Sequence, residues 1–423
     1  MSAASEIPET DAEAAFALAR DLAAGAVWAD GVCAFHGAGA PAELGLPVPF
    51  RAFGGDLYEG SAGVARFLAC VARLGGDAEL ARVARGAIGH AFARAEGWSL
   101  FSGGLGIGLV ALELAEWLEA PDLVPPAVRL IERASAAALA EARAGTAPAD
   151  LLAGLAGVVL GLVAAEPYDL DGDWPARARA IASALAGQAV QRGAGLAWPL
   201  APGGELCLCG LGHGASGVAL AFEALGDPAF AAAARRARAF ERGWYAPEFG
   251  SWADLRGAPT SFPDLPPCPR MWCHGSVGIA AERLRADPGD PLARADLAGA
   301  LAGIRVEIEA LVAGPRGPAA GDGINGSQCH GLGGMSDLLI DVWLRTGDAD
   351  WLALARAATG ALREDARRPG GWRCGVPGGE ATPGLMLGLA GIGWAQLRAA
   401  HPEAVPSAWA PAPGRVLAGT PTR

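Results

Sequence analysis

Apolar stretches with helical character recur along the chain, and each follows the same small motif. Seven times, two glycines three residues apart open a run of mostly apolar residues. Separations of 43, 51, 60, 61, 56 and 57 residues between the motifs predict a repeat architecture, in which each unit buries its apolar face against its neighbours. The first glycines of the seven motifs are Gly60, Gly103, Gly154, Gly214, Gly275, Gly331 and Gly388.

A second helix is predicted in most units by a Gly-Asp pair that follows the apolar run. Glycine can end the first helix, and aspartate can cap the next one. Each unit is therefore interpreted as helix, turn, helix, and the scarcity of alternating β-branched residues predicts no strands. Such hairpins could stack into an open solenoid or close into a ring, and periodicity alone leaves both open. The pairs are Gly76-Asp77, Gly172-Asp173, Gly226-Asp227, Gly289-Asp290 and Gly347-Asp348.

Charge and composition exclude some classes of function. A net charge of -12 over 423 residues argues against a nucleic-acid partner, which requires a basic surface, but is compatible with a peptide partner. The N-terminus is acidic and does not resemble a secretory signal. The longest apolar run, Leu151 to Ala165, is shorter than the roughly 20 residues of a membrane span. A cytoplasmic location is expected.

Half of the histidines occupy one repeated position. His213, His274 and His330 each precede the first glycine of a unit, and Cys273 and Cys329 precede two of them. One Cys-His-Gly sequence is most simply a buried cysteine at a tight helix start, but two at equivalent positions favour metal ligation. Two thiolates and an imidazole suit a zinc ion whose fourth position stays open. The sequence therefore predicts one Zn²⁺ held by Cys273, Cys329 and His330, which favours a ring because different units must converge.

The motifs that carry this chemistry resemble those of the lanthionine synthetase C-like family. The resemblance rests on GLGHGASG, WCHGSVG, QCHGLGG and TPGLMLGLAGIGW, and it covers roughly residues 55–400. WCHG and GLMLGLAGIG are most similar to the C-terminal cyclase domain of bifunctional lanthipeptide synthetases. The resemblance implies an all-α fold, an α/α toroid of seven inner and seven outer helices. Residues 1–54 would form a helical lead-in, and residues 401–423 a proline-rich tail.

The resemblance also implies an activity, the addition of cysteine thiols to dehydroalanine or dehydrobutyrine in a precursor peptide. Cys273, Cys329 and His330 match the family's zinc ligands.

Four further residues match catalytic positions of the family. His213 matches a histidine that is thought to act as acid and base. Asp150 matches an aspartate that could orient His213 or carry protons, although a helix N-cap is an equal alternative from the residues alone. His274 stands where some members have tyrosine. Arg270 takes the place of an arginine just upstream of the first zinc cysteine, at a spacing that differs by one residue. Either Arg270 or His274 could stabilise an enolate oxygen.

The expected partners are a dehydrated precursor peptide and a separate dehydratase, because the resemblance includes no dehydratase domain. Three alternatives remain open at this point. The chain could add glutathione to dehydrated residues, it could be a scaffold that binds peptide and dehydratase, or it could be another thiol-alkylating toroid such as a prenyltransferase subunit. Cys207 and Cys209 are interpreted as packing thiols in preference to a second metal site.

Overall fold

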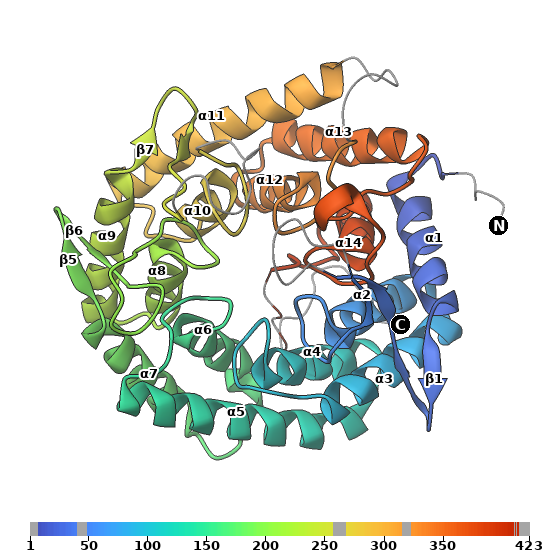
Figure 1. Cartoon of the computed structure of the whole chain (residues 1–423), viewed down its shortest axis with the longest axis horizontal. Helices are drawn as coiled ribbons and strands as arrows, with labels where there is room; N and C mark the ends of the chain where they lie inside the picture. Colours follow the sequence, from blue (N-terminus) through green and yellow to red (C-terminus); the bar gives the residue numbers. More distant parts are fainter. Residues whose placement is uncertain are drawn as a thin grey trace.

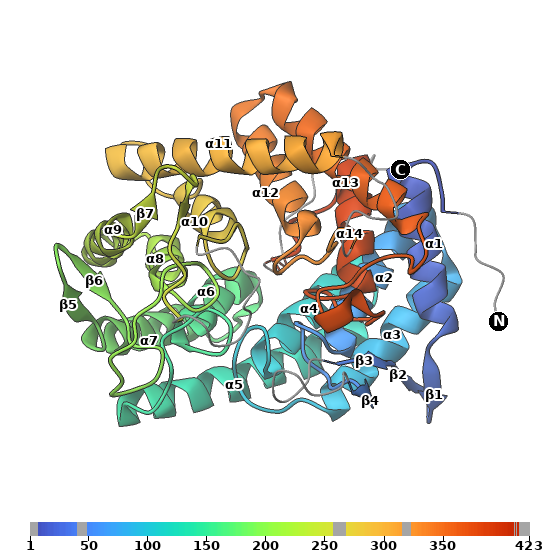
Figure 2. The same cartoon turned by 45° about the horizontal axis from the view of Figure 1, so that its top comes forward.

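The computed structural model describes residues 7–39, 49–256, 268–314 and 323–409, together with Pro411 and Pro413. Its helices form two concentric rings, as Figures 1 and 2 show, and the predicted α/α toroid is confirmed. The inner helices are α2 (Ser61–Gly75), α4 (Gly104–Trp117), α6 (Leu155–Ala165), α8 (Ala215–Ala224), α10 (Ser276–Arg283), α12 (Leu332–Thr346) and α14 (Leu389–Ala400). The outer helices that follow them are α3 (Ala78–Ala93), α5 (Val124–Ala144), α7 (Trp174–Gly187), α9 (Pro228–Arg242), α11 (Pro291–Ala313) and α13 (Ala349–Ala366).

The seventh outer helix comes from the other end of the chain. Helix α1 (Asp11–Ala24) packs against α14, the last inner helix. It starts with a capping box in which Thr10 and Glu13 bond each other's backbone N–H groups, and Asp11 pairs with Arg363 of α13. The first and last helices of the chain therefore complete the same unit.

The glycine motifs lie where the helix starts crowd together. The first glycine of each motif directly precedes an inner helix in all seven units. The second glycine meets a backbone carbonyl from the loop before the helix. A Cβ atom on Gly106 would lie 1.8 Å from the carbonyl oxygen of Leu100, and one on Gly278 would lie 2.0 Å from that of Trp272. Only glycine permits this approach without a shift of the backbone.

The Gly-Asp pairs mark the second helices as predicted, with one variation. In the third unit Asp169, and not Asp173, accepts a hydrogen bond from the backbone N–H of Trp174 at the start of α7. In the other four units the aspartate itself accepts backbone N–H groups of the first helical turn: Asp77, Asp227, Asp290 and Asp348.

The expectation of no strands is wrong, because four small antiparallel hairpins occur among the described residues. Each strand has only two or three residues, too few for a visible alternation of apolar and polar positions. In the first hairpin Asp30 and Gly31 both have positive φ, as a tight two-residue turn requires. The pairs are β1 (Val27–Ala29) with β2 (Val32–Ala34), β3 (His36–Ala38) with β4 (Phe50–Ala52), β5 (Val190–Arg192) with β6 (Gly195–Ala197), and β7 (Tyr245–Ala246) with β8 (Ser251–Trp252).

A closed circle of backbone hydrogen bonds joins the seven loops that precede the inner helices. In each loop, the residue two before the first glycine donates its N–H to the carbonyl of its counterpart in the next unit. These seven residues are called the rim below, and their circle closes the molecule into a ring and excludes the open solenoid. The N···O distances are Tyr58 to Phe101 2.9 Å, Phe101 to Leu152 3.1 Å, Leu152 to Gly212 3.3 Å, Gly212 to Cys273 3.2 Å, Cys273 to Cys329 3.4 Å, Cys329 to Met386 2.9 Å and Met386 to Tyr58 2.8 Å.

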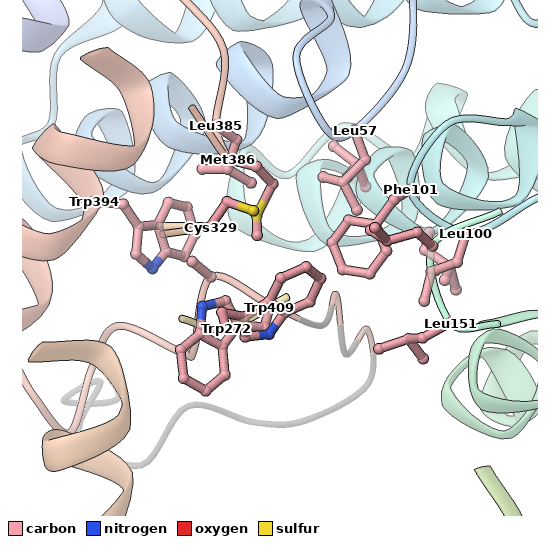
Figure 3. Packing of buried hydrophobic residues seen from close by; sticks show 14 of the residues in the cluster. Leu57, Leu100, Phe101, Leu151, Trp272, Cys329, Leu385, Met386, Trp394 and Trp409 are labelled. Carbon is pink, nitrogen blue, oxygen red and sulfur yellow. The ribbon is translucent and has the colours of Figure 1, made fainter. Parts of the chain in front are cut away.

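The segment after α14 folds back into the ring. Trp409 is buried and its ring lies 6.3 Å from that of Trp272, the neighbour of a rim cysteine (Figure 3). Beside this segment is a cavity of about 720 Å³, lined by α4, α6 and α8, by Trp272, by residues between Pro402 and Trp409, and by Pro411 and Pro413. Within the described residues, no helix is long and apolar enough to cross a membrane.

Candidate active site

The rim brings the two predicted zinc cysteines together. The backbone N–H groups of Trp272 and Cys273 both donate to the carbonyl of Cys329, at 2.9 and 3.4 Å. The Cys273 thiol in turn donates a hydrogen bond to the Cys329 sulfur, which also accepts one from the Tyr58 hydroxyl at 2.9 Å. Two thiols that are 56 residues apart in sequence, those of Cys273 and Cys329, thus meet on adjacent units.

Their surroundings set the charge state of this sulfur pair. The hydrogen bond from Cys273, and then the one from Tyr58 and the charge of Arg256, lower the pKa of Cys329 against the effect of burial. Donating that bond, and then burial, raises the pKa of Cys273. Burial and the two thiols raise the pKa of Tyr58 well above its ordinary value, so its hydroxyl remains a donor. Of the two thiols, Cys329 is therefore the one that ionises more readily.

His330, the third predicted ligand, is held by the next unit. Its Nε2–H donates a hydrogen bond to the carbonyl of Gly375 at 3.0 Å. The imidazole packs closely on this glycine, because a Cβ atom on Gly375 would lie 3.0 Å from the imidazole Cε1. The hydrogen bond fixes the tautomer and leaves Nδ1 as the nitrogen with a lone pair, which is how histidine ligands are commonly oriented in metal sites.

The residues present fit a zinc ion by their chemistry. In the described parts of the chain, no three His, Cys, Asp or Glu side chains already form a group that could hold a metal. The Cys273 and Cys329 thiols share a hydrogen bond, and His330 donates one to the Gly375 carbonyl. The set of two thiols and one imidazole with a fixed tautomer is nevertheless that of a catalytic zinc with one open position. Cys273, Cys329 and His330 would hold the ion.

Asp150 and His213 form a pair on the same side of the ring. His213 Nδ1 donates to Asp150 Oδ2 at 2.7 Å, while Asp150 Oδ1 accepts the N–H of Ala153 at 2.8 Å. Asp150 is buried, and a third of the His213 side chain is exposed. The aspartate is thus both a local cap and the group that orients the histidine, which leaves His213 Nε2 free for proton transfer.

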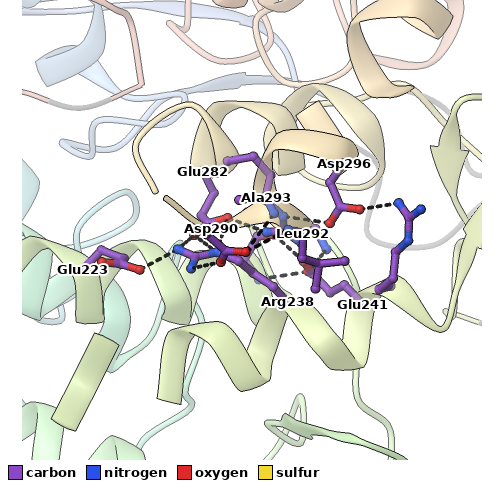
Figure 4. Close-up of polar contacts among 12 residues, drawn as sticks. Glu223, Arg238, Glu241, Glu282, Asp290, Leu292, Ala293 and Asp296 are labelled. Carbon is purple, nitrogen blue, oxygen red and sulfur yellow. Dashed lines mark hydrogen bonds and ion pairs between the residues drawn. The ribbon is translucent and has the colours of Figure 1, made fainter. Parts of the chain in front are cut away.

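A buried ion network positions the loop that carries His213. The carboxylate of Glu241 accepts the N–H groups of Gly210 and Ser216, at 3.0 and 2.9 Å, on either side of His213. Glu241 is itself paired with Arg283 at 2.7 Å, and Arg283 also binds Asp296 and Glu282. From Glu282 the network continues to Arg238, which pairs with Glu223 and Asp290 (Figure 4). Burial of so many paired charges ties α8, α9, α10 and α11 to one arrangement.

His274 lies between the two parts of the site but carries no charge. Its ring is stacked on that of His213, with centroids 5.7 Å apart, and it hydrogen-bonds the backbone of Cys209. Burial, followed by the charge of Arg256, lowers the pKa of His274 to about 3. A neutral, buried imidazole can pack against His213, but it does not offer positive charge to an enolate.

The structure does not bring Arg270 to the thiols. Its guanidinium pairs with Glu307 of α11 at 2.8 Å and also binds the carbonyl of Phe249. The cation whose charge acts on Cys273, Cys329 and His274 is Arg256, which is held by Asp254 through its Nε at 3.0 Å. Neither Arg256 nor Tyr58 was expected at the site from the sequence. Tyr58 could have been found, because it occupies the position of the two cysteines in the first repeat.

Comparisons with known proteins agree with the fold. The family model described as "Lanthionine synthetase C-like protein" matches residues 52–409. A solved structure described as "Nisin cyclase" is similar in fold, with a TM-score of 0.59 and 17% sequence identity over 81% of this chain and 88% of that chain. No curated protein matches the sequence.

Proposed function

We propose, since the chain belongs to the lanthionine synthetase C-like family, that it is a zinc-dependent cyclase that closes thioether rings in a dehydrated precursor peptide. The observation that supports this most is the placement of two kinds of chemistry on one rim. Cys273 and Cys329 meet on adjacent units, and the His213–Asp150 pair comes from the loops of the two units that precede them. A thiol nucleophile and a proton donor are what the addition of a thiol to a dehydro residue needs.

The thiol must be ionised to attack. A free cysteine thiol has a pKa of about 8.5 and is mostly protonated at neutral pH. Zinc held by Cys273, Cys329 and His330 would supply a Lewis acid that keeps the substrate's cysteine in the thiolate form. The ligand set also contributes two negative charges, so the sulfur keeps its nucleophilic character.

The remaining steps fall to residues of the chain itself. The thiolate adds to the β-carbon of the dehydro residue, and the electron pair of the double bond moves toward the neighbouring carbonyl as an enolate. With its Nδ1–H held by Asp150, His213 takes up at Nε2 the proton that the substrate thiol releases, and then delivers it from Nε2 to the α-carbon. Arg256, and not Arg270, supplies the positive charge near the developing enolate. His274 supports the His213 ring by stacking.

A dehydrated peptide with free cysteines tests the activity. Incubation with the protein should consume thiols while the peptide mass stays unchanged, because the addition only rearranges atoms. Glutathione in the same mixture distinguishes ring closure from the second candidate function, the addition of glutathione to dehydrated residues. That addition would increase the peptide mass by the mass of glutathione. A protein that binds the peptide and leaves every thiol free would be a scaffold. The unmodified peptide with ATP should also keep its mass, since dehydration is assigned to a separate enzyme.

Metal content tests the zinc assignment independently. Cys329→Ala should lose the metal and the activity together while keeping its helix content, because the repeats have their own core. Full zinc occupancy in that variant would place the ion elsewhere in the chain.

A further inference from the structure

The proposed function exposes the protein's own cysteines to its substrate. A dehydro residue accepts any thiolate, and Cys273 and Cys329 would be thiolates in the same site as the substrate thiol. Addition of either to the substrate would attach the peptide to the enzyme and destroy the site. A cyclase of this design therefore needs a device that makes the ligand sulfurs poorer nucleophiles than the substrate sulfur.

Tyr58 is placed where such a device would act. Its hydroxyl donates a hydrogen bond to Cys329 Sγ at 2.9 Å, although the two residues are 271 positions apart. Tyr58 stands at the same rim position as the two cysteines, and its backbone is fixed on both sides. The Tyr58 N–H bonds the carbonyl of Phe101, and its carbonyl accepts the N–H of Met386, whose own carbonyl accepts the N–H of Cys329.

The aromatic ring of Tyr58 is also held. It packs edge-on against Phe101, with centroids 6.4 Å apart and an interplanar angle of 78°. The hydroxyl is therefore delivered to the sulfur by a fixed backbone and a packed ring, and it is not a mobile side chain that happens to touch a thiol.

We propose that Tyr58 protects Cys329 from alkylation by the dehydrated substrate. Its O–H engages a lone pair of the sulfur, and a thiolate that accepts such a bond holds its electrons more tightly. In the reaction that is prevented, a bond forms from Cys329 Sγ to the β-carbon, the double-bond electrons move to the α-carbon, and a proton from water completes the adduct. This inference extends the proposed function and concerns the selectivity of the same site.

The matched pair Tyr58→Phe and Tyr168→Phe tests it. The hydroxyl of Tyr168 binds Glu116, in α4. Each zinc-loaded protein is incubated with N-acetyldehydroalanine methyl ester, a small electrophile, and its mass is followed over time. Tyr58→Phe should gain one adduct, mapped to Cys329, about ten- to a hundred-fold faster than the wild type, the range that loss of one bond to a charged group allows. Tyr168→Phe should behave as the wild type.

A spectroscopic measurement complements the adduct assay. With Co²⁺ in place of zinc, the thiolate-to-metal charge-transfer band of Tyr58→Phe should shift relative to the wild type, because the sulfur becomes a stronger donor. A loss of stability without a change at the sulfur would leave the band in place. Tyr58→Met, which carries the residue found at the neighbouring rim position Met386, removes the hydroxyl in a second way.

Two outcomes overturn the inference. Equal rates of alkylation in the folded Tyr58 variants and the wild type would show that the hydroxyl does not protect the sulfur. An adduct that maps to Cys273 or to a remote cysteine would show that Cys329 is not the residue at risk. Because the probe is a small electrophile and the readout is the protein's mass, both outcomes are distinct from a failure of the wild type to cyclise a peptide.

Discussion

Asp150 uses its two carboxylate oxygens for two different contacts. One carboxylate oxygen caps the loop through the N–H of Ala153, and the other accepts the Nδ1–H of His213. The helix N-cap that the sequence also allowed is not formed, because Gly154 precedes α6 without a side-chain cap. A carboxylate has enough lone pairs to serve both contacts, and the sharp turn before α6 aims the second oxygen across to the next unit.

This division predicts a specific effect of Asp150→Asn. The amide can still cap the loop, but it no longer holds His213 in one tautomer with a full negative charge. We expect ring formation to slow by about 10²–10⁴, the range for a disabled acid–base group, with zinc content unchanged. Single-turnover cyclisation of a dehydrated peptide measures it, and His213→Ala should fall in the same range. If Asp150→Asn turned over normally while His213→Ala did not, Asp150 would be a cap alone.

Substitutions of Arg256 and Arg270 are expected to have opposite effects on the rate of cyclisation and on stability. Arg256 acts electrostatically on the thiols and on His274, whereas Arg270 is engaged by Glu307 in the outer ring. Arg256→Gln should reduce the rate of cyclisation by about 10²-fold, as for the loss of one group that stabilises an oxyanion. Arg270→Gln should retain most of the rate and lose thermal stability instead. Rates and melting temperatures of both variants decide the assignment, and the reverse order would return the role to Arg270.

At the scale of elements, the second glycine of each motif is a packing requirement. A methyl group on Gly106 would lie 1.8 Å from the carbonyl oxygen of Leu100, so Gly106→Ala must displace the loop or the helix. We expect a loss of about 2–4 kcal/mol in the free energy of unfolding. Gly187, at the end of α7, has nothing within 4 Å of its Cβ position, and Gly187→Ala should be neutral or stabilising by up to about 1 kcal/mol. Urea denaturation of both variants makes the comparison, and equal midpoints would contradict it.

The sequence predicted those elements whose signal is local. Seven glycine motifs and four capping aspartates predicted where helices begin. Close packing of two backbones, or a cap, restricts the residue type at that position itself. Arg256 reaches the site only through tertiary contacts, and no local pattern distinguishes it, whereas Tyr58 is identified only by its position in the repeat. The position of α1 as the seventh outer helix could not be predicted either, because the residues of α1 do not specify which helix it will contact.

At the scale of the whole molecule, closure of the ring depends on both ends of the chain. The N-terminal helix completes the last unit, and the segment after α14 enters the inner ring near the first unit. Arg66 of α2 is fully buried, pairs with Glu113 and donates to the carbonyls of Ser407 and Ala408, at 3.3 and 2.8 Å. These contacts span about 340 positions in the sequence, so they form only when the ring is complete.

A chain that ends at His401 should therefore be much less stable than one that ends at Pro413. The shorter chain removes two acceptors of Arg66, the carbonyl of Pro406 that accepts from Trp394 Nε1 at 3.0 Å, and the buried Trp409. Loss of a buried tryptophan alone costs about 3–5 kcal/mol, and each buried donor left unpaired costs about 1–3 more. Urea denaturation of the two truncated chains measures the difference, and equal midpoints would mean that the segment is only a surface feature.

The chain ending at Pro413 keeps these contacts, so a loss of stability confined to the shorter chain assigns the stability to residues 402–413. Because Trp409 packs on Trp272, whose N–H and whose neighbour Cys273 both bond the carbonyl of Cys329, the shorter chain should also bind zinc less tightly than the longer one.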